Sequence, residues 1–409
     1  MTADRRVKVG IIGLGRVAVG ITRALARSPL FEMVAAADLR PAARDAFQSA
    51  YGGRAYDSIE KLCVDPDVEA VWVLTPHEHH AEHALMAIEH GKHLVVEKPI
   101  EIRVDAALRM VEAAERNGVV LMAGGSRSYD PALRAMRDII ASGELGKVCA
   151  LNTWSYSGWM LRPRADSEID IARGGGVVFS QGAHQADLIR VMAGGPVRSV
   201  RGALGQWMPE RSTPGYYSAF LEFEGGTLAT MVYDGYGYFL GHELVPWSES
   251  RSSSGDGERS PEAMRAYRQR LREGGLDEYG LRESSRFRGS PATSVVPSGE
   301  TRASREPPPW VPTDAGLLVV SCERGALRQS AHGVYVYADE GRREVVVRNH
   351  GDSRSTELSE FYDAVVHGKP VPYDGRWGAA TLEVVTAIVE SDQTGREVVL
   401  KHQVGPAPR

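Results

Sequence analysis

Two short segments carry residue types that could together perform redox chemistry. Residues 7–18 (VKVGIIGLGRVA) end in the glycine turn Gly13-Leu14-Gly15-Arg16-Val17-Ala18. Residues 97–99 (Glu-Lys-Pro) place Lys98 directly after a later apolar run. The turn has the spacing of a dinucleotide-binding loop, and a lysine amine beside a bound nicotinamide ring could handle a proton or stabilise a developing alkoxide. The two segments together predict hydride transfer.

The surroundings of the glycine turn support this interpretation. Alternating β-formers precede it, and Val17, Ile21 and Leu25 recur at helical spacing after it. Gly13 permits the tight turn and Gly15 lets the backbone approach a pyrophosphate. Arg16 and Val17 open the helix, whose free N–H groups would hold the phosphates. The alternative is an ordinary strand–helix turn.

An acidic residue at the end of the next apolar run argues against that alternative. Asp38 follows residues 33–37, twenty positions after Ala18, where a carboxylate accepts hydrogen bonds from the adenosine ribose. A carboxylate there favours NAD over NADP because it repels a 2′-phosphate. Arg40 can accommodate that phosphate, so NADP stays open.

Further strand ends are expected to meet at the same crevice. The apolar run 70–74 ends at Thr75-Pro76, and the run 93–96 ends at Glu97-Lys98. In a parallel sheet, ligands bind outside the carboxyl ends of the strands. We therefore expect Thr75, Pro76 and Glu97 to join Gly13 and Asp38 at the cofactor.

Four histidines follow Thr75-Pro76, namely His77, His79, His80 and His83. The segment contains no HExxH motif and no nearby cysteine pair, so it predicts no metal site. These histidines are expected to cap a helix or to line the cofactor cleft, and His80 is the one we assign to the cofactor.

The order of these motifs resembles the glucose–fructose oxidoreductase, inositol dehydrogenase and rhizopine-catabolism (Gfo/Idh/MocA) family. The resemblance rests on the glycine turn, Asp38, the turn at 75–80, Gly91-Lys92-His93, Glu97-Lys98-Pro99, and Gly174-Gly175-Gly176 followed by His184 and Asp187. It implies an N-terminal Rossmann domain, which is a doubly wound parallel sheet, and a C-terminal domain with a large open, mostly antiparallel sheet. It also implies that Lys98 is the active-site lysine and His184 the proton-transferring histidine.

The chain departs from the family pattern at one position. The family usually carries aspartate four residues before that histidine, and this chain has Ser180. The departure puts sugar and polyol specificity in doubt. Residues 174–187 and 374–383 look more like the branch of the 4,5-dihydroxyphthalate-forming cis-dihydrodiol dehydrogenases.

Residue types between 154 and 173 point toward an aromatic acid. Trp159 could stack on a flat ring, and Arg162 or Arg173 could bind a carboxylate bidentately. With Ser180 and Asp187 they form the predicted substrate site. The alternative is that the arginines are solvated surface residues, because exposed arginines are common.

Length and charge set the class of protein. The 409 residues carry a net charge of −5 with both signs interspersed, which gives no electrostatic case for nucleic acid or an anionic membrane. The first residues contain no signal-peptide apolar region, and no apolar run is long enough to span a membrane. The three cysteines are widely spaced, which suggests reduced thiols. We expect a cytoplasmic enzyme.

The domains are expected at 1–125 for the dinucleotide and at 126–409 for substrate and oligomer contacts. Strand-like runs after residue 148, with a hairpin signal at Gly225-Gly226, predict an antiparallel sheet. Residues 244–312 are rich in Ser, Gly, Arg, Glu and Pro and are interpreted as an insertion, either a lid or a surface segment, with a charged helix at 261–273. One sheet face would need cover from a partner, so a homodimer or homotetramer is expected.

The leading hypothesis is an NAD(P)-dependent dehydrogenase that oxidises an aromatic-acid cis-dihydrodiol. The second is a sugar or cyclitol dehydrogenase of the same family. The third is a non-catalytic NAD-binding sensor, because a fold alone does not give a function.

Overall fold

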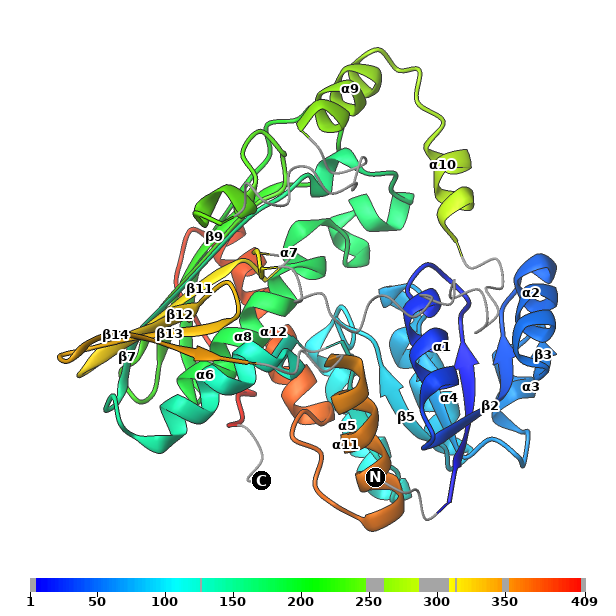
Figure 1. Ribbon diagram of the computed structural model, residues 1–409. Coiled ribbons are helices and arrows are strands. Elements are labelled where there is room, and N and C mark those ends of the chain that lie inside the picture. Colours follow the sequence, from blue (N-terminus) through cyan, green and yellow to red (C-terminus); the bar gives the residue numbers. More distant parts are fainter. Residues whose placement is uncertain are drawn as a thin grey trace, which may run out of the picture.

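The computed structural model describes residues 5–125, 127–247, 261–286, 309–312, 315–347 and 353–405. The chain builds two sheets that lie side by side, with helices packed between and around them (Figure 1). Within these residues no helix is both long and apolar enough to cross a membrane.

The first sheet is the predicted doubly wound parallel sheet. Its six strands have the order β3-β2-β1-β4-β5-β6, and all the pairs are parallel. The buried runs seen in the sequence are β1 (Val7–Ile12), β2 (Phe31–Ala37), β4 (Ala70–Val73), β5 (His93–Val96) and β6 (Leu121–Ala123), and the short β3 (Arg54–Tyr56) lies at one edge. The helices that connect them are α1 (Ala18–Arg27), α2 (Pro41–Tyr51), α3 (Ile59–Cys63), α4 (His80–Glu89) and α5 (Val104–Asn117).

The second sheet has nine strands in the order β14-β13-β12-β11-β7-β10-β9-β8-β15. Every neighbouring pair is antiparallel except β7 and β10, so the prediction of a mostly antiparallel sheet is confirmed. The strands are β7 (Val148–Tyr156), β8 (Val197–Gly205), β9 (Tyr216–Phe223), β10 (Leu228–Asp234), β11 (Leu317–Cys322), β12 (Gly325–Gln329), β13 (Gly333–Ala338), β14 (Gly341–Val346) and β15 (Val398–Val399).

Helices cover one face of this second sheet. They are α6 (Pro131–Ser142), α7 (Gly176–Ser180), α8 (Gly182–Ala193) and α12 (Gly375–Thr394). Along β7, Leu151, Thr153 and Ser155 are buried while the residues between them are partly exposed. This alternation is that of a strand covered on one face only.

A helix from the end of the chain covers the first sheet. α11 (Ser353–His367) places Phe361 against Trp72 of β4, with the ring centroids 5.1 Å apart, and beside Phe31 of β2 at 6.3 Å. Figure 1 shows α11 on the Rossmann side of the molecule, where it contacts α1. The first sheet therefore takes part of its core from residues that follow the second sheet.

The insertion contains two described helices, α9 (Pro261–Arg272) and α10 (Glu278–Ser285). α9 agrees with the predicted charged helix, and α10 was not anticipated. Residues 248–260, 287–308 and 313–314, within or just beyond the predicted insertion, lie outside the described residues.

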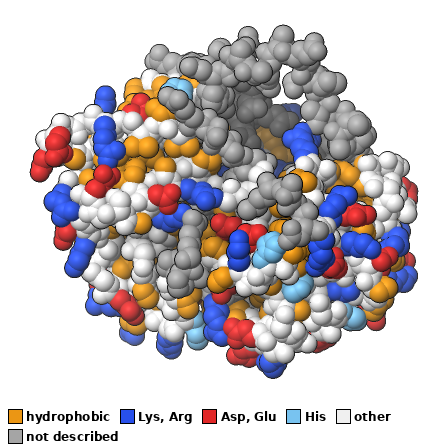
Figure 2. Space-filling model, turned by 60° about the horizontal axis from the view of Figure 1, so that its bottom comes forward, with side chains coloured by type: hydrophobic (Ala, Val, Ile, Leu, Met, Phe, Trp, Pro, Cys, Tyr) orange, Lys and Arg blue, Asp and Glu red, His pale blue; other side chains and the backbone are white. Residues whose placement is uncertain are grey.

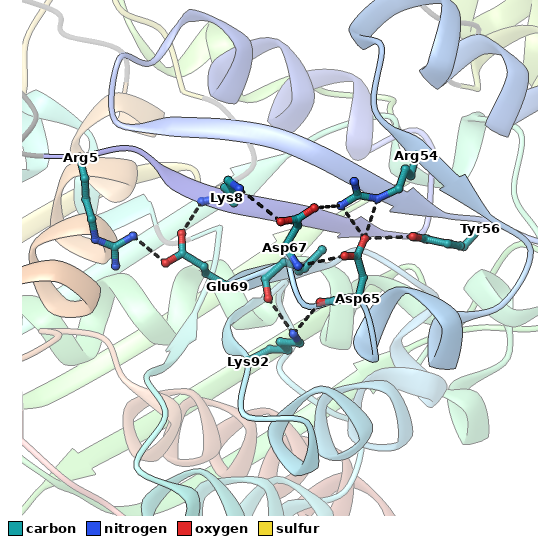
Figure 3. A network of polar contacts seen from close by, with 9 residues as sticks. Arg5, Lys8, Arg54, Tyr56, Asp65, Asp67, Glu69 and Lys92 are labelled. Carbon is teal, nitrogen blue, oxygen red and sulfur yellow. Dashed lines mark hydrogen bonds and ion pairs between the residues drawn. The ribbon is translucent and has the colours of Figure 1, made fainter.

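A polar network joins the amino ends of the Rossmann strands (Figure 3). The Lys92 ammonium donates to the backbone carbonyls of Asp65 at 2.9 Å and Val68 at 2.7 Å. The Asp65 carboxylate accepts from Arg54 at 2.8 Å and from Tyr56 at 2.9 Å. Because these are the amino ends of parallel strands, the network lies opposite the edge where ligands bind.

Replacing Lys92 with methionine should therefore lower stability without affecting ligand binding. The side chain is only 8% exposed, and losing two charged hydrogen bonds should cost about 1.5–3 kcal/mol for each bond in denaturant unfolding. Lys61→Met is the control, because the Lys61 ammonium forms an exposed ion pair with Asp57. Unchanged stability in Lys92→Met, or an equal loss in both variants, would contradict this role.

Candidate functional site

The glycine turn between β1 and α1 has the geometry of a phosphate-binding loop. Gly13 has φ +92°, and a Cβ there would lie 3.0 Å from Thr75 Cγ2, so the turn requires glycine. Among the residues that the structure describes, a Cβ on Gly15 would meet no atom within 4 Å. No described neighbour therefore requires glycine at position 15, whereas a pyrophosphate approaching the backbone would. Arg16 and Val17 are exposed at the same turn.

Asp38 lies at the end of β2 and connects to the glycine turn. One carboxylate oxygen accepts from the Leu14 N–H at 2.8 Å, and the other accepts from Arg40 Nε at 3.0 Å. Arg40 also donates to the Leu14 carbonyl at 2.7 Å. The two residues predicted to choose between NAD and NADP therefore form one ion pair.

The turn after β4 contains Thr75, Pro76 and the histidine cluster. His80 is fully buried, with Nδ1 2.9 Å from the Pro99 carbonyl and Nε2 2.8 Å from the Thr75 carbonyl. It joins the turn after β4 to the turn that carries Lys98. The structure thus gives His80 a positioning role, and a contact with the cofactor stays a prediction.

The neighbouring histidines also bind protein groups. His77 Nδ1 lies 3.2 Å from the Gly174 carbonyl, and His83 Nδ1 lies 2.8 Å from Thr75 Oγ1. Burial lowers the pKa of His77 to about 3 and that of His83 to about 4, so both rings are neutral at neutral pH. Among the described residues, no group of His, Cys, Asp or Glu side chains is arranged to hold a metal ion.

Lys98 follows β5 and reaches across to the second domain. Its ammonium donates to the backbone carbonyl of Ser180, at the end of α7, over 2.7 Å. The Ser180 hydroxyl instead donates to the Gly176 carbonyl at 2.9 Å, within its own helix. The main chain at position 180 therefore orients the lysine, and the side chain is not needed for this contact.

His184 lies one helical turn further, in α8. It is 7% exposed, and within the described part of the chain no hydrogen bond is found for its ring. Burial first, and then the charges of Lys98, Arg127 and Arg354, lower the pKa of His184 well below its ordinary value. The imidazole is therefore neutral at neutral pH and can accept a proton.

Both predicted catalytic residues line one pocket between the two domains. Its walls come from the turns after β5 and β6, from α8, and from the start of α12, and consist of Lys98, Pro99, Ile100, Ala123, Gly124, Gly125, Ala183, His184, Asp187, Tyr373, Trp377, Gly378, Thr381 and Leu382. Asp187 accepts from Trp377 Nε1 at 2.7 Å and from Ser128 Oγ at 3.0 Å. It fixes the pocket wall, and a contact between Asp187 and the substrate remains a prediction.

A cluster of ion pairs connects the turn that carries Lys98 to α11. Glu97 accepts from the Lys98 N–H at 3.2 Å and pairs with Arg354 at 3.5 Å. Arg354 also pairs with Glu357 at 2.5 Å, and Glu357 accepts from the Gly125 N–H at 2.8 Å. Burial raises the pKa of Glu357. Glu97, predicted to contact the cofactor, is thus tied to α11.

The predicted substrate residues between 159 and 173 do not line this pocket. Trp159 is 3% exposed, and the buried Arg164 guanidinium lies 3.7 Å above its ring. Arg173 is exposed and forms a bidentate pair with Glu78. Arg162 is partly buried, and its carbonyl accepts from Arg211 at 3.0 Å. Their roles toward a substrate stay predictions.

Sequence reasoning missed several groups around the pocket. Trp377 and Thr381 belong to the segment 374–383, which was singled out only as a resemblance. Arg127, Arg354 and Glu357 had no motif to identify them, since α11 reaches the site only through the tertiary fold.

Three family models match successive parts of the chain. Residues 7–125 match the oxidoreductase family NAD-binding Rossmann fold of Gfo/Idh/MocA proteins. Residues 133–237 match a Gfo/Idh/MocA C-terminal domain, and residues 317–400 match the oxidoreductase family C-terminal α/β domain.

Comparison with individual proteins extends over nearly the whole chain. A 1-carboxy-3-chloro-3,4-dihydroxycyclohexa-1,5-diene dehydrogenase from Comamonas testosteroni is 32% identical over 389 residues, covering 94% of each chain. A crystal structure of a Bordetella bronchiseptica RB50 protein assigned as a dehydrogenase superposes with a TM-score of 0.84 at 36% identity, covering 97% of this chain and 100% of that one. A levoglucosan dehydrogenase in complex with NADH and levoglucosan shares the fold, with a TM-score of 0.73 at 17% identity over 97% of this chain and 99% of that one.

The dinucleotide loop, the pocket lined by Lys98 and His184, and the matches along both domains agree with one another. The chain belongs to the Gfo/Idh/MocA family of NAD(P)-dependent oxidoreductases.

Proposed function

We propose that this dehydrogenase oxidises a cis-dihydrodiol of an aromatic carboxylic acid to the corresponding aromatic diol. The observation that carries the proposal is a pocket lysine combined with an uncharged side chain at position 180. Lys98 lines the pocket together with His184, and position 180 carries a hydroxyl in place of the carboxylate usual in the family. Arg354, which also acts on His184, is balanced by Glu97 and Glu357. A site with this lysine and without that carboxylate suits an anionic substrate better than a site that carries the carboxylate.

Lys98 and His184 would have separate roles, namely charge stabilisation by Lys98 and proton transfer by His184. Lys98 would donate a hydrogen bond to the carbinol oxygen and stabilise the charge that develops there. His184 would accept the hydroxyl proton as general base. The bound nicotinamide supplies the hydride acceptor. The substrate loses one hydride from carbon and one proton from oxygen, and the resulting ketone tautomerises to the aromatic diol, which makes oxidation favourable.

The similarity to the Comamonas testosteroni protein supports this substrate class. That protein is named for a chlorinated, carboxylated cyclohexadiene diol. Its coverage of 94% of both chains includes the pocket segments of both domains. At 32% identity the ring substituents can differ, so the proposal is limited to carboxylated cis-dihydrodiols.

NAD is the proposed cofactor, with NADP as a weaker substitute. The Asp38 carboxylate would accept from the ribose and disfavour a 2′-phosphate. Its ion pair with Arg40 moderates that repulsion, since the guanidinium already lies 3.0 Å from the carboxylate. Thr75, Pro76 and the N–H groups after Gly13 and Gly15 would complete the binding crevice.

The uncovered face of the second sheet supports a homo-oligomer. Val232 lies on its partly exposed side and Phe220 is 39% exposed, while Trp154 on the same face packs against Val245 and Val311. The face of the molecule seen in Figure 2 is different, because acidic and basic side chains are mixed over its coloured part. That part of the face has no broad area of a single charge. We propose a dimer or tetramer that buries the open sheet face.

Light scattering should detect this assembly. At micromolar concentration the particle mass should be at least twice the 44.5 kDa of one chain, because an apolar sheet face gains free energy by burial. Phe220→Glu should shift the mass toward the monomer, whereas Val64→Glu, at an exposed position directly after α3 in the first domain, should not. A wild-type mass of one chain would rule out the oligomer.

Lys98→Met should abolish most of the turnover while leaving cofactor binding intact. One donor that stabilises charge in the transition state is typically worth about 10²-fold or more in kcat. Steady-state NAD reduction gives the rate, and NADH fluorescence gives the cofactor affinity. Lys369→Met, which removes an exposed partner of Asp363, is the control. Near-wild-type turnover would remove Lys98 from the mechanism.

Ser180→Asp tests the charge of the substrate. A carboxylate beside an anionic substrate should lower kcat/KM for an aromatic-acid dihydrodiol by about tenfold or more, given Coulomb energies of a few kcal/mol at contact distance. Ser180→Asn, which has the same shape without the charge, should lose less. If the aspartate variant instead gains activity on inositols or aldoses, a polyol substrate is indicated and the aromatic-acid proposal fails.

A further inference from the structure

An acidic side chain on the open face of the second sheet has no cationic partner. Asp234, at the end of β10, pairs across the sheet with Tyr156 of β7 and Tyr216 of β9. It lies two residues beyond Val232 and therefore on the same, partly exposed side of the strand. One carboxylate oxygen accepts from the Tyr236 N–H at 2.8 Å, and burial raises the pKa of the carboxyl group. Within the described residues, no lysine, arginine or histidine forms an ion pair with Asp234.

Aromatic rings flank this carboxylate on both sides. The Tyr156 ring packs edge-to-face on Phe239 with the centroids 5.1 Å apart, and the Tyr216 ring lies 5.3 Å from that of Trp207. Trp207 is 57% exposed and Phe239 is 39% exposed. A guanidinium can stack on an aromatic ring while its N–H groups bind a carboxylate. The surroundings of Asp234 therefore suit an arginine side chain.

The same sheet face carries an arginine without an acidic partner. Arg342 of β14 is exposed, and its guanidinium lies 4.7 Å from the centroid of the Tyr335 ring. The strand register continues from Arg342 across the sheet to Leu228 of β10, which lies on the same side as Asp234. The described part of the chain supplies no carboxylate within ion-pair distance of Arg342. One open face thus presents both an acid and a base that lack opposite charges.

We propose that Asp234 binds Arg342 of a second copy of this chain when two open sheet faces meet. A two-fold axis makes the contact reciprocal, so that each copy supplies one acid and one base and two ion pairs form. The two groups cannot pair within one copy. Four strands separate β10 from β14, which places the side chains about 20 Å apart at the usual strand spacing. This contact presupposes the proposed homo-oligomer and is independent of the substrate.

Charge complementarity favours a second copy as the occupant of this face. A charge that is removed from water is costly unless it is paired. Whatever covers the face must therefore bring a cation to Asp234 and an acid to Arg342, and a second copy of the chain brings both at once. The exposed Phe220 and the partly exposed Val232 add apolar area on the same face. Apolar contact would supply affinity, and the two ion pairs would fix the orientation of the copies.

Mixing two full-length variants tests the ion pair directly. Asp234→Arg should bring two arginines together in its homodimer, and Arg342→Asp should bring two acids together, so each should raise the dissociation constant by about tenfold or more. In the mixed dimer, the introduced arginine meets the introduced aspartate, and the remaining Asp234 and Arg342 form the native pair. Sedimentation velocity with one variant fluorescently labelled should therefore show mixed dimers of nearly wild-type affinity. Absence of this recovery on mixing would overturn the proposal.

Two further variants separate the ion pair from the oligomer itself. Asp234→Asn keeps an acceptor for the Tyr236 N–H and removes only the charge, so it should weaken association without lowering the melting temperature. Arg343→Asp is the matched control, because Arg343 pairs with Glu144 on the helix-covered side of the sheet and should not affect association. If Phe220→Glu separates the copies and Asp234→Asn does not, the oligomer stands and the ion pair is wrong. A wild-type mass of one chain would refute both.

Discussion

The catalytic arrangement depends on one hydrogen bond between the domains, from the Lys98 ammonium to the Ser180 carbonyl at 2.7 Å. The lysine belongs to the parallel sheet that binds the cofactor, and the carbonyl belongs to α7, directly before the helix that carries His184. A charged hydrogen bond of this length orients the ammonium toward the pocket that Lys98 and His184 line. Because the acceptor is main chain, the side chain at position 180 can change without loss of the orientation of the lysine.

That bond is useful only if both its ends are rigid, and the fold supplies the rigidity from distant segments. His80 holds the turn of Lys98 through the Pro99 carbonyl, and Glu97 is tied through Arg354 to α11. On the other side, α8 is fixed to α12 by Asp187, which binds Trp377, and by Arg190, whose guanidinium lies 3.7 Å above the same indole. Buried charges are costly unless they are paired, so these groups hold their geometry strongly once it is formed.

The sequence was sufficient for the parts of the structure that repeat local patterns. The strands of the first sheet are continuous apolar runs, and the strand ends at Gly13, Asp38, Thr75 and Lys98 meet at one edge because parallel strands must. The short strands β3, β12 and β15 were missed because two to five residues carry too little periodicity. Trp159 and Arg173 were assigned to a substrate by residue type alone. Whether an arginine contacts a ligand, a glutamate or an indole depends on tertiary neighbours, and Arg354 reaches the pocket from α11 with no local signal.

The same charge distribution serves two requirements of the proposed reaction. Burial and the cations around His184 lower its pKa, which keeps the imidazole in the neutral form that a general base requires but makes it a weaker base. Lys98, which lines the pocket with His184, also attracts a carboxylate on the substrate. A carboxylate at position 180 would raise the pKa of the histidine and would repel an acid. In a sugar dehydrogenase the balance is different, because a neutral substrate needs no surplus of positive charge and an aspartate can orient the histidine. The hydroxyl at position 180 is therefore the choice expected where the substrate itself brings the negative charge.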